Sequence, residues 1–385
     1  MTDPMHPNRR EFIKQAAGAG GLLAASPMLA TGLARPWISK GKTRHIVLIA
    51  FAGGVRTKET FGRESNIPQL KALADEGVLY TRVRTSNLGH FGAGLSVFTG
   101  VSAARGIREN SPGSEPTLFE YLRKGLRLPA GEVWVTTSGG AQQVNYASSL
   151  HPNYGPDFGA TTLDGDGIFN DEFKRLLAGY GMPHELGAGE ERALGRLRGA
   201  LSGAGQLSQA ALDSAARVES YIMQELTRGT AELSGSNAAD IKALTLARNL
   251  LSVFRPTVVG VVLQDADVAH RSFNGYVEVI RRNDAAVGEI MSVIREDPLL
   301  ADSTAVVVLP EFGRDRDLNM RRGLDHGDDS DDLNYVTCTA WGPDFGRGKV
   351  IDDDVRTIDI VPSLCQLMGV DAPHARGHKL PGLLM

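Results

Sequence analysis

The chain has 385 residues, of which 42% are hydrophobic and 22% are charged, and these shares are ordinary for a soluble globular protein. This length indicates one large α/β domain or two smaller ones, because a single hydrophobic core usually stops growing at about 250–300 residues. The net charge of −4 argues against a nucleic-acid partner, since nucleic-acid-binding proteins usually carry a basic surface. It leaves room for a small anionic substrate bound by local charges.

The N-terminus has the pattern of an export signal. The segment "NRREFIK" (8–14) precedes a small-residue, moderately apolar stretch (15–34), which is too rich in Gly and Ala to be a good membrane-spanning helix. The pair Arg9–Arg10 in this setting predicts a twin-arginine signal peptide over residues 1–34. We therefore expect export to the periplasm, with the twin-arginine translocase as partner and no membrane span in the mature chain.

The first half of the mature chain alternates between strand-like and helix-like segments. Strands are short runs of β-branched residues, and helices show apolar residues at helical spacing. In chain order, the pattern predicts a strand at 45–51, a helix at 66–78, a strand at 79–85, helices at 92–100 and 117–126, and a strand at 132–138.

The second half contains a region of different composition and then returns to the same alternation. Residues of about 160–255 are Ala-rich and helical in pattern, with Gly and Ser breaks, and predict a helical insertion. The chain then predicts strands at 257–263, 304–309 and 335–341 and helices at 273–296 and 357–369. The fold class that follows is α/β, with a mostly parallel sheet and helices on both of its faces.

The two cysteines are expected to be inert. Cys338 falls in a strand-like run and Cys365 in a helix-like run, so both are predicted to be buried free thiols. A disulfide between them would require suitable geometry, which the sequence does not show.

Polar residues with metal-binding chemistry follow several of the predicted strands. Ligands of open parallel sheets bind beyond the carboxyl ends of the strands, so side chains in these segments should converge. Imidazoles with carboxylates suit a divalent cation. The alternative is a polar cleft whose histidines only bond to loop carbonyls. The residues concerned are His90, His270 and His326, with Asp265, Asp267, Glu311 and Asp325.

Several segments resemble the alkaline phosphatase and sulfatase superfamily. The segment "SNIPQLKALADEGVLYTRV" and the C-terminal stretch 355–380 are similar to characteristic superfamily segments. The motifs "GHFGAG…TG", "DVAH" and "PEFGR…DHG" resemble most closely a poorly characterised branch of sulfatase-like proteins with twin-arginine signals. The resemblance covers about residues 45–380, with the 160–255 region as a variable insert.

The resemblance implies a set of metal ligands at these motifs. It points to His270, His326, Glu311 and either Asp267 or Asp265, because the superfamily spacing between Asp and His differs by one residue from that of "DVAH". Zn²⁺ is the expected metal, with Ca²⁺ or Mg²⁺ as the other candidates.

The resemblance also implies catalytic residues and shows departures from the family pattern. His90 stands ten residues before Gly100, where the superfamily has its nucleophile, and is expected to be a nucleophile, a ligand or a general base. Arg314 is expected either to bind substrate oxygens as a fork or to form a surface ion pair with Asp315 or Asp317. The sulfatase "CxPSR" motif is absent, and the first strand ends in "FAGG" where the family has a metal-binding Asp.

Two functions follow from these observations. The first is an exported, metal-dependent hydrolase of small anionic phosphate or sulfate esters, with a single-metal or an irregular two-metal centre. The second is a degenerate, non-catalytic superfamily member that binds a ligand or a partner. The missing first-strand Asp and the missing Ser, Thr or Cys nucleophile favour the second, whereas the retained histidines and carboxylates favour the first.

The export signal gives a direct prediction. Replacing both Arg9 and Arg10 with lysine should block export of the folded protein, because the twin-arginine signal depends on the arginine pair rather than on positive charge alone. The measurement is the amount of protein in the periplasmic fraction. Undiminished periplasmic protein in the double variant would contradict the signal assignment.

Overall fold

The computed structural model describes residues 41–102, 112–128, 130–138, 143–164 and 238–384. The signal peptide predicted over 1–34 lies outside these residues, as does the 165–237 part of the helical insert. Both therefore stay predictions. The described residues all fall within one compact unit, and the description below concerns that unit.

A mixed, mostly parallel sheet forms the centre of the unit. Its strand order is β4-β3-β5-β1-β6-β7-β2-β8, with β9 paired to β2. Among the described strands, only β7 runs antiparallel to its neighbours, β6 and β2. The strands are β1 (His45–Phe51), β2 (Val78–Arg84), β3 (Val133–Thr137), β4 (Thr161–Asp164), β5 (Val258–Leu263), β6 (Thr304–Pro310), β7 (Tyr335–Trp341), β8 (Lys349–Ile351) and β9 (Val355–Arg356). The predicted α/β class and all of the predicted strands are confirmed.

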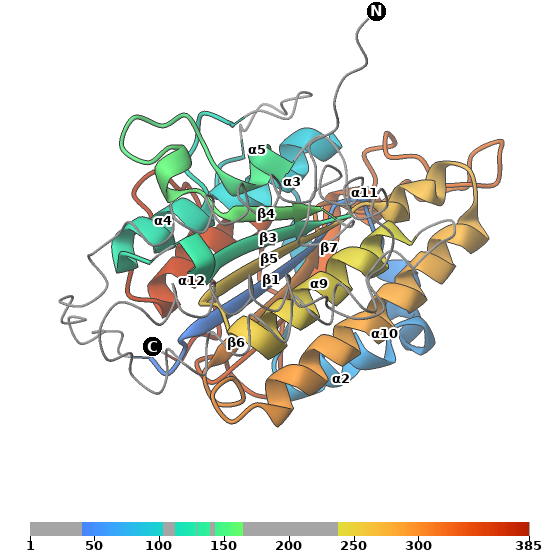
Figure 1. Ribbon diagram of the computed structural model, residues 1–385. Helices are drawn as coiled ribbons and strands as arrows, with labels where there is room; N and C mark the ends of the chain where they lie inside the picture. Colours follow the sequence, from blue (N-terminus) through green and yellow to red (C-terminus); the bar gives the residue numbers. More distant parts are fainter. Residues whose placement is uncertain (1–40, 103–111, 129, 139–142, 165–237, 385) are drawn as a thin grey trace, which may run out of the picture. The chain divides into compact units, whose positions relative to one another are not determined.

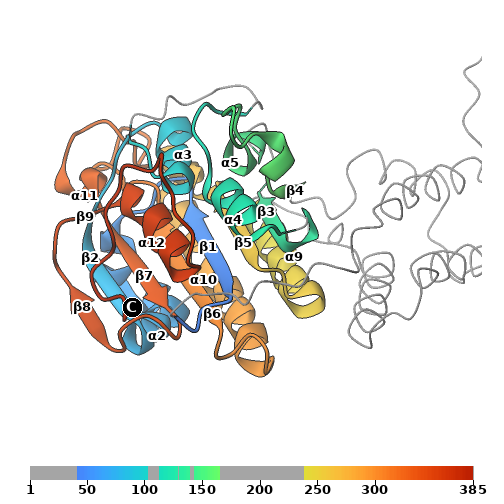
Figure 2. The same ribbon diagram turned by 90° about the vertical axis from the view of Figure 1, so that its left-hand side faces the viewer.

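Helices cover both faces of the sheet (Figures 1 and 2). One face carries α2 (Pro68–Glu76), α9 (Ala239–Phe254) and α10 (Phe273–Glu296). The other carries α3 (His90–Thr99), α4 (Leu118–Leu126), α5 (Gln143–Ala147) and α12 (Ile360–Leu367), and the short α11 (Asp331–Asn334) precedes β7. The helices predicted at 66–78, 92–100, 117–126, 273–296 and 357–369 are thus all present, with shifted ends at most of them.

The central strands are buried on both faces, which explains their continuous apolar sequences. In β1, Val47, Ile49 and Phe51 belong to the core shared with α2, α9 and α10. The alternate residues Ile46 and Leu48 are also fully buried, toward the opposite helical layer. Such a strand does not show the alternation of apolar and polar residues that is typical of a half-exposed strand.

Both ends of the predicted 160–255 insert belong to the central α/β arrangement. Residues Thr161–Asp164 form strand β4, parallel to β3, rather than a helix. Residues Ala239–Phe254 form α9, whose buried apolar side chains join the core beneath β5. The Ala-rich composition correctly predicted the helix α9. The prediction that this helix belongs to an insertion was wrong, because α9 packs on the sheet.

Two further expectations concern the cysteines and the membrane. Cys338 and Cys365 are both free and buried, as predicted.

Within the described part of the chain, no helix is both long enough and apolar enough to cross a bilayer.

A buried carboxylate fixes the segment that leaves β5. Asp240, near the start of α9, is fully buried, and its Oδ1 accepts from the main-chain N–H of Gln264 (2.8 Å) and of Asp265 (3.1 Å). Its Oδ2 accepts from Asn283 Nδ2 at 2.7 Å. Burial, and then the nearby Asp265 carboxylate, raise the pKa of Asp240 to about 7. This residue therefore joins α9, α10 and the turn after β5.

Asp240→Ala should destabilise the protein by about 2–4 kcal/mol, because the Asp265 N–H and the Asn283 amide would each lose an acceptor inside the structure. The Gln264 N–H would keep its bond to Ser138 Oγ. The measurement is urea unfolding followed by circular dichroism. Asp302→Ala, at an exposed site, is the matched control and should change stability by less than about 0.5 kcal/mol. Equal unfolding midpoints for the two variants would contradict the assigned role of Asp240.

Candidate metal and catalytic site

The site lies where β1, β5 and β6 end. These strands are in register, so that Phe51 stands opposite both Leu263 and Pro310. The segments that follow them leave the sheet at one edge, as expected for parallel strands. Helix α3 begins near the same edge and contributes its first residue, His90.

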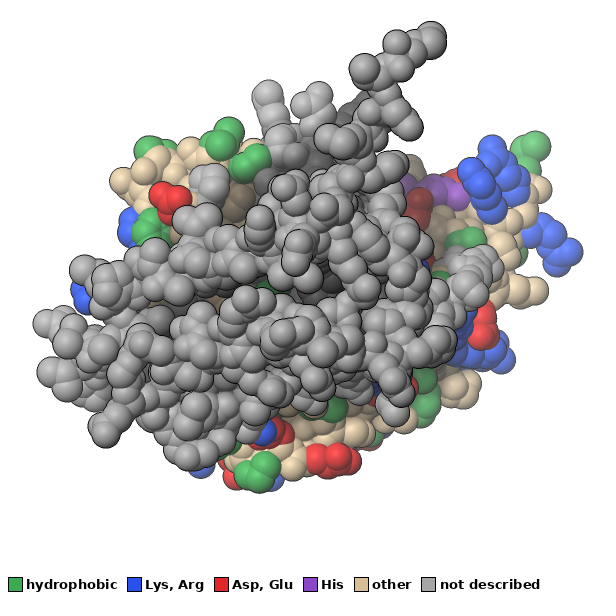
Figure 3. Space-filling view, viewed as in Figure 1, with side chains coloured by type: hydrophobic (Ala, Val, Ile, Leu, Met, Phe, Trp, Pro, Cys, Tyr) green, Lys and Arg blue, Asp and Glu red, His purple; other side chains and the backbone are tan. Residues whose placement is uncertain are grey.

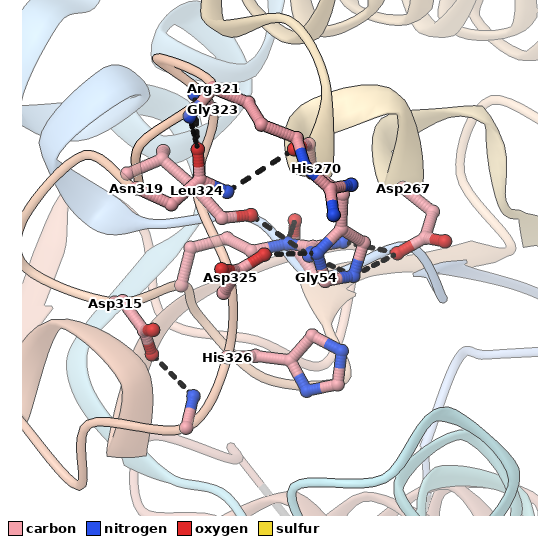
Figure 4. A network of polar contacts seen from close by, with 12 residues as sticks. Gly54, Asp267, His270, Asp315, Asn319, Arg321, Gly323, Leu324, Asp325 and His326 are labelled. Carbon is pink, nitrogen blue, oxygen red and sulfur yellow. Dashed lines mark hydrogen bonds and ion pairs between the residues drawn. The ribbon is translucent and has the colours of Figure 1, made fainter.

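Four of the predicted residues converge there. One ligand atom from each of His90, Asp267, His270 and His326 lies within 4.8 Å of the other three. The ring centroid of His326 is 4.8 Å from that of His90 and 5.0 Å from that of His270. Figure 4 shows the His270 ring between Asp325 and Asp267, with the His326 ring beside it. The three histidines come from segments that are far apart in the sequence.

Each imidazole is tied at Nδ1 to an oxygen atom. His270 Nδ1 is 2.6 Å from Asp325 Oδ1, and His326 Nδ1 is 3.1 Å from the main-chain oxygen of Leu88. An Nδ1–H that donates to these oxygens leaves the Nε2 lone pair available. Metal-binding histidines are usually oriented in this way by a carboxylate or a carbonyl oxygen.

His90 has the same arrangement but a more buried partner. Its Nδ1 is 2.6 Å from Glu311 Oε1 and 3.0 Å from the main-chain oxygen of Ala52. Its Nε2 lies 3.0 Å from Asp267 Oδ1, the same oxygen that faces His270 Nε2. The two ring nitrogens of His90 therefore each face a carboxylate.

The donor set fits a divalent cation of the zinc type. Asp267 Oδ1 lies 3.0 Å from His90 Nε2 and 3.3 Å from His270 Nε2. Ligands bound tetrahedrally at zinc–ligand distances of about 2.05 Å would be separated by about 3.3 Å. The contact that competes with an ion is that of Arg314 Nη1 with His270 Nε2, at 3.1 Å.

The short helix after β5 places Asp267, and not Asp265, beside the histidines. Residues Asp265–His270 form a 3-10 helix, in which residues three apart lie on the same side. Asp267 therefore faces His270, whereas Asp265 Oδ2 accepts from the main-chain N–H of Asp240. The three-residue spacing of "DVAH" thus suits the helix type found here.

Glu311 lies behind His90 rather than among the four converging residues. Its side chain is fully buried, and its main-chain N–H donates to Phe51 O at 3.1 Å. Burial raises the pKa of Glu311 to about 7, against the opposing effect of His90. Burial alone would lower the pKa of His90, but Asp267 and Glu311 outweigh it and raise that pKa to about 9. The geometry makes Glu311 a partner of His90, not a member of the cluster.

Two other side chains of the cluster have shifted pKa values. Burial would raise the pKa of Asp267, yet His90 and Arg314 hold it well below its usual range. The pKa of His326 is lowered by burial first and then by the nearby His90 and Arg314. A low pKa keeps each of these groups in the deprotonated form that a metal ligand requires.

Arg314 matches neither of its predicted roles. It is fully buried, and its side chain donates to Asp267 Oδ1 at 2.6 Å and to main-chain oxygens. It therefore forms neither an exposed fork for substrate oxygens nor a surface pair with Asp315 or Asp317. The sequence misleads here because Arg314 stands at the start of a highly charged loop, while the chain folds its side chain inward.

The partners of the imidazoles were only partly predictable. Asp325 neighbours His326 in the sequence, but its carboxylate contacts His270. The Leu88 oxygen belongs to the main chain, so the residue type at position 88 does not indicate its role as an acceptor. In the space-filling view, histidine side chains reach the surface next to acidic ones, with basic side chains close by (Figure 3).

Comparison with known proteins gives matches in structure but not in sequence. No family model and no curated protein sequence matches the chain. A variant of alkaline phosphatase PafA superimposes with a TM-score of 0.58 at 10% identity, covering 89% of this chain and 99% of that one.

Two sulfatase structures are similar to a comparable degree. The 2-O GAG sulfatase BT1596 has a TM-score of 0.54 at 13% identity, with 89% of this chain and 74% of that one covered. A proposed sulfatase from Bacteroides thetaiotaomicron has a TM-score of 0.52 at 13% identity, with 89% and 76% covered. At such identities the likeness concerns the fold, and the chain has the α/β fold of alkaline phosphatase and its structural relatives.

Proposed function

We propose that this protein is an exported, metal-dependent hydrolase of small phosphate or sulfate esters. The observation that carries the proposal is the convergence of His270, His326 and Asp267, with both imidazoles tied at Nδ1. Three protein ligands and one open position are the pattern of catalytic zinc sites. The fold shared with a phosphatase and with sulfatases supports the same chemistry. Export rests on Arg9–Arg10 and the small-residue stretch after them.

His90 is assigned a proton-transfer role rather than that of a fourth ligand. Four protein ligands would close a tetrahedral site and leave no place for substrate. His90 also differs from the other two histidines, because its Nδ1 faces a fully buried carboxylate, that of Glu311. A buried carboxylate behind an imidazole fixes its tautomer and stabilises the imidazolium during proton transfer. Nε2 of His90 then faces the reacting ester.

The chain's own residues divide the remaining work. Asp267, His270 and His326 would hold the ion, and Asp325 and the Leu88 oxygen orient the two rings. A bound Zn²⁺ polarises the ester oxygen and activates water at neutral pH.

The start of α3 offers a place for the anionic group of the substrate. Its N-cap residue, Gly89, has no side-chain cap, and the N–H of Gly92 already donates to Gly89 O, so an anion would meet the N–H groups of the first two helical residues. His90 is the first residue of the same helix, so the reacting group would then lie next to its Nε2.

Metal binding should depend on His326. The wild-type protein should retain zinc after dialysis, and His326→Ala should lose it, because one of three ligands is removed. Zinc is measured by inductively coupled plasma mass spectrometry, and circular dichroism checks the fold. His151→Ala, a histidine outside the cluster, is the control and should retain zinc. Unchanged zinc content in His326→Ala would refute the metal site.

Activity should separate His90 from the ligands. His90→Ala should retain zinc but lower kcat by roughly 10²–10⁴-fold, as expected for loss of a proton-transfer group. The rates are measured with p-nitrophenyl phosphate and p-nitrophenyl sulfate. Loss of zinc in His90→Ala would show that His90 is a ligand. A zinc-loaded wild-type protein that hydrolyses neither these nor other phosphate and sulfate esters would favour the non-catalytic alternative.

A further inference from the structure

Arg314 is the largest fully buried side chain of the described part of the protein. A guanidinium is costly to bury unless its N–H groups are paired and its charge is balanced. It lies directly beside the proposed metal site, where Asp267 Oδ1 accepts from Nη2 at 2.6 Å. A permanent positive charge therefore occupies the interior of the site.

All five N–H groups of this guanidinium have acceptors. Nε donates to Gly54 O (3.3 Å), Nη1 to Leu324 O (3.3 Å) and to His270 Nε2 (3.1 Å), and Nη2 to Gly53 O and to Asp267 Oδ1. Four of these five acceptors are oxygen atoms, which are the ligands that hard cations prefer. When an ion takes His270 Nε2, Nη1 still has Leu324 O. The guanidinium can therefore remain in place beside a bound ion.

The turn after β1 is shaped around the guanidinium. Gly54 has a φ of +67°, and a Cβ added there would lie 3.0 Å from Arg314 Nε and 2.7 Å from a ring carbon of Phe312. A Cβ at Gly53 would lie 2.7 Å from the main-chain nitrogen of Asp267. The glycine pair thus lets two carbonyl oxygens and the short 3-10 helix close around Arg314.

We propose that Arg314 is the fixed second cation of this site, so that the protein binds one divalent ion per chain and not two. The inference rests on the proposed metal site. Oδ1 of Asp267 contacts both the histidine nitrogens and the guanidinium, and the guanidinium itself reaches His270 Nε2 at 3.1 Å. A second ion near Gly53 and Gly54 would need the oxygens that Arg314 already holds, and it would meet the guanidinium charge at short range.

The test compares metal stoichiometry in the wild type and in Arg314→Ser, measured by native mass spectrometry with excess zinc. The wild type should bind one ion. The variant should take up a second ion, because the freed oxygens and the lost charge leave a cation site. Low-millimolar guanidinium chloride should return the variant to one ion and raise its melting temperature, since free guanidinium refills the space. Sodium chloride at equal concentration should do neither.

Two controls separate the charge from the fold. Arg316→Ser, at an exposed arginine of the same loop, should leave the stoichiometry at one. Arg314→Lys keeps a cation at this position and should also bind one ion. This variant is measured instead if Arg314→Ser does not fold. Two ions in the wild type, or a folded Arg314→Ser with one ion and no response to guanidinium, would overturn the inference. Failure of the proposed function is distinct, since it would appear as a wild type with no zinc or no ester hydrolysis.

Discussion

The carboxylate of Asp267 is the contact on which the site depends. One oxygen, Oδ1, lies 2.6 Å from Arg314 Nη2, 3.0 Å from His90 Nε2 and 3.3 Å from His270 Nε2. Among the residues that the structure describes, it is the one carboxylate oxygen within 3.3 Å of all three groups, so it sets both their spacing and the balance of charge. Removing it would leave the buried guanidinium of Arg314 without this carboxylate to balance its charge, and an uncompensated buried charge is strongly destabilising.

The surrounding fold holds this carboxylate through main-chain contacts. The turn after β5 is fixed from one side by Asp240 of α9 and from the other by Leu324, whose N–H donates to Ala269 O at 2.7 Å. Asn319 Nδ2 adds a bond to His270 O at 3.2 Å. The charged loop after β6 therefore contributes side chains to the site and also holds the neighbouring 3-10 helix by hydrogen bonds. A site held by such elements keeps its geometry before any ligand binds.

The sequence predicted the parts of this protein that depend on periodicity and on strand ends. Continuous β-branched runs identified the central strands, and the apolar spacing of 273–296 identified α10 over its full length, Phe273–Glu296. The convergence of His90, His270 and His326 followed from the rule that ligands gather at the carboxyl edge of a parallel sheet. The placement of Arg314 and Glu311 did not follow, because burial of a charged side chain depends on acceptors that distant main-chain segments supply. Strand β4 was missed because it is only four residues long, Thr161–Asp164, and was assigned to the helical insert.

The 3-10 helix at Asp265–His270 carries a consequence for how related chains are aligned. In this helix the third residue after an aspartate returns to the same side, whereas in an α-helix the third and the fourth both lie close to it. Adding one residue between Asp267 and His270 would turn the imidazole away unless the backbone relaxed into an α-turn at the same time. Motif length and helix type should therefore change together during evolution, and aligning such chains by a fixed Asp-to-His interval would pair residues that do not occupy the same place in space.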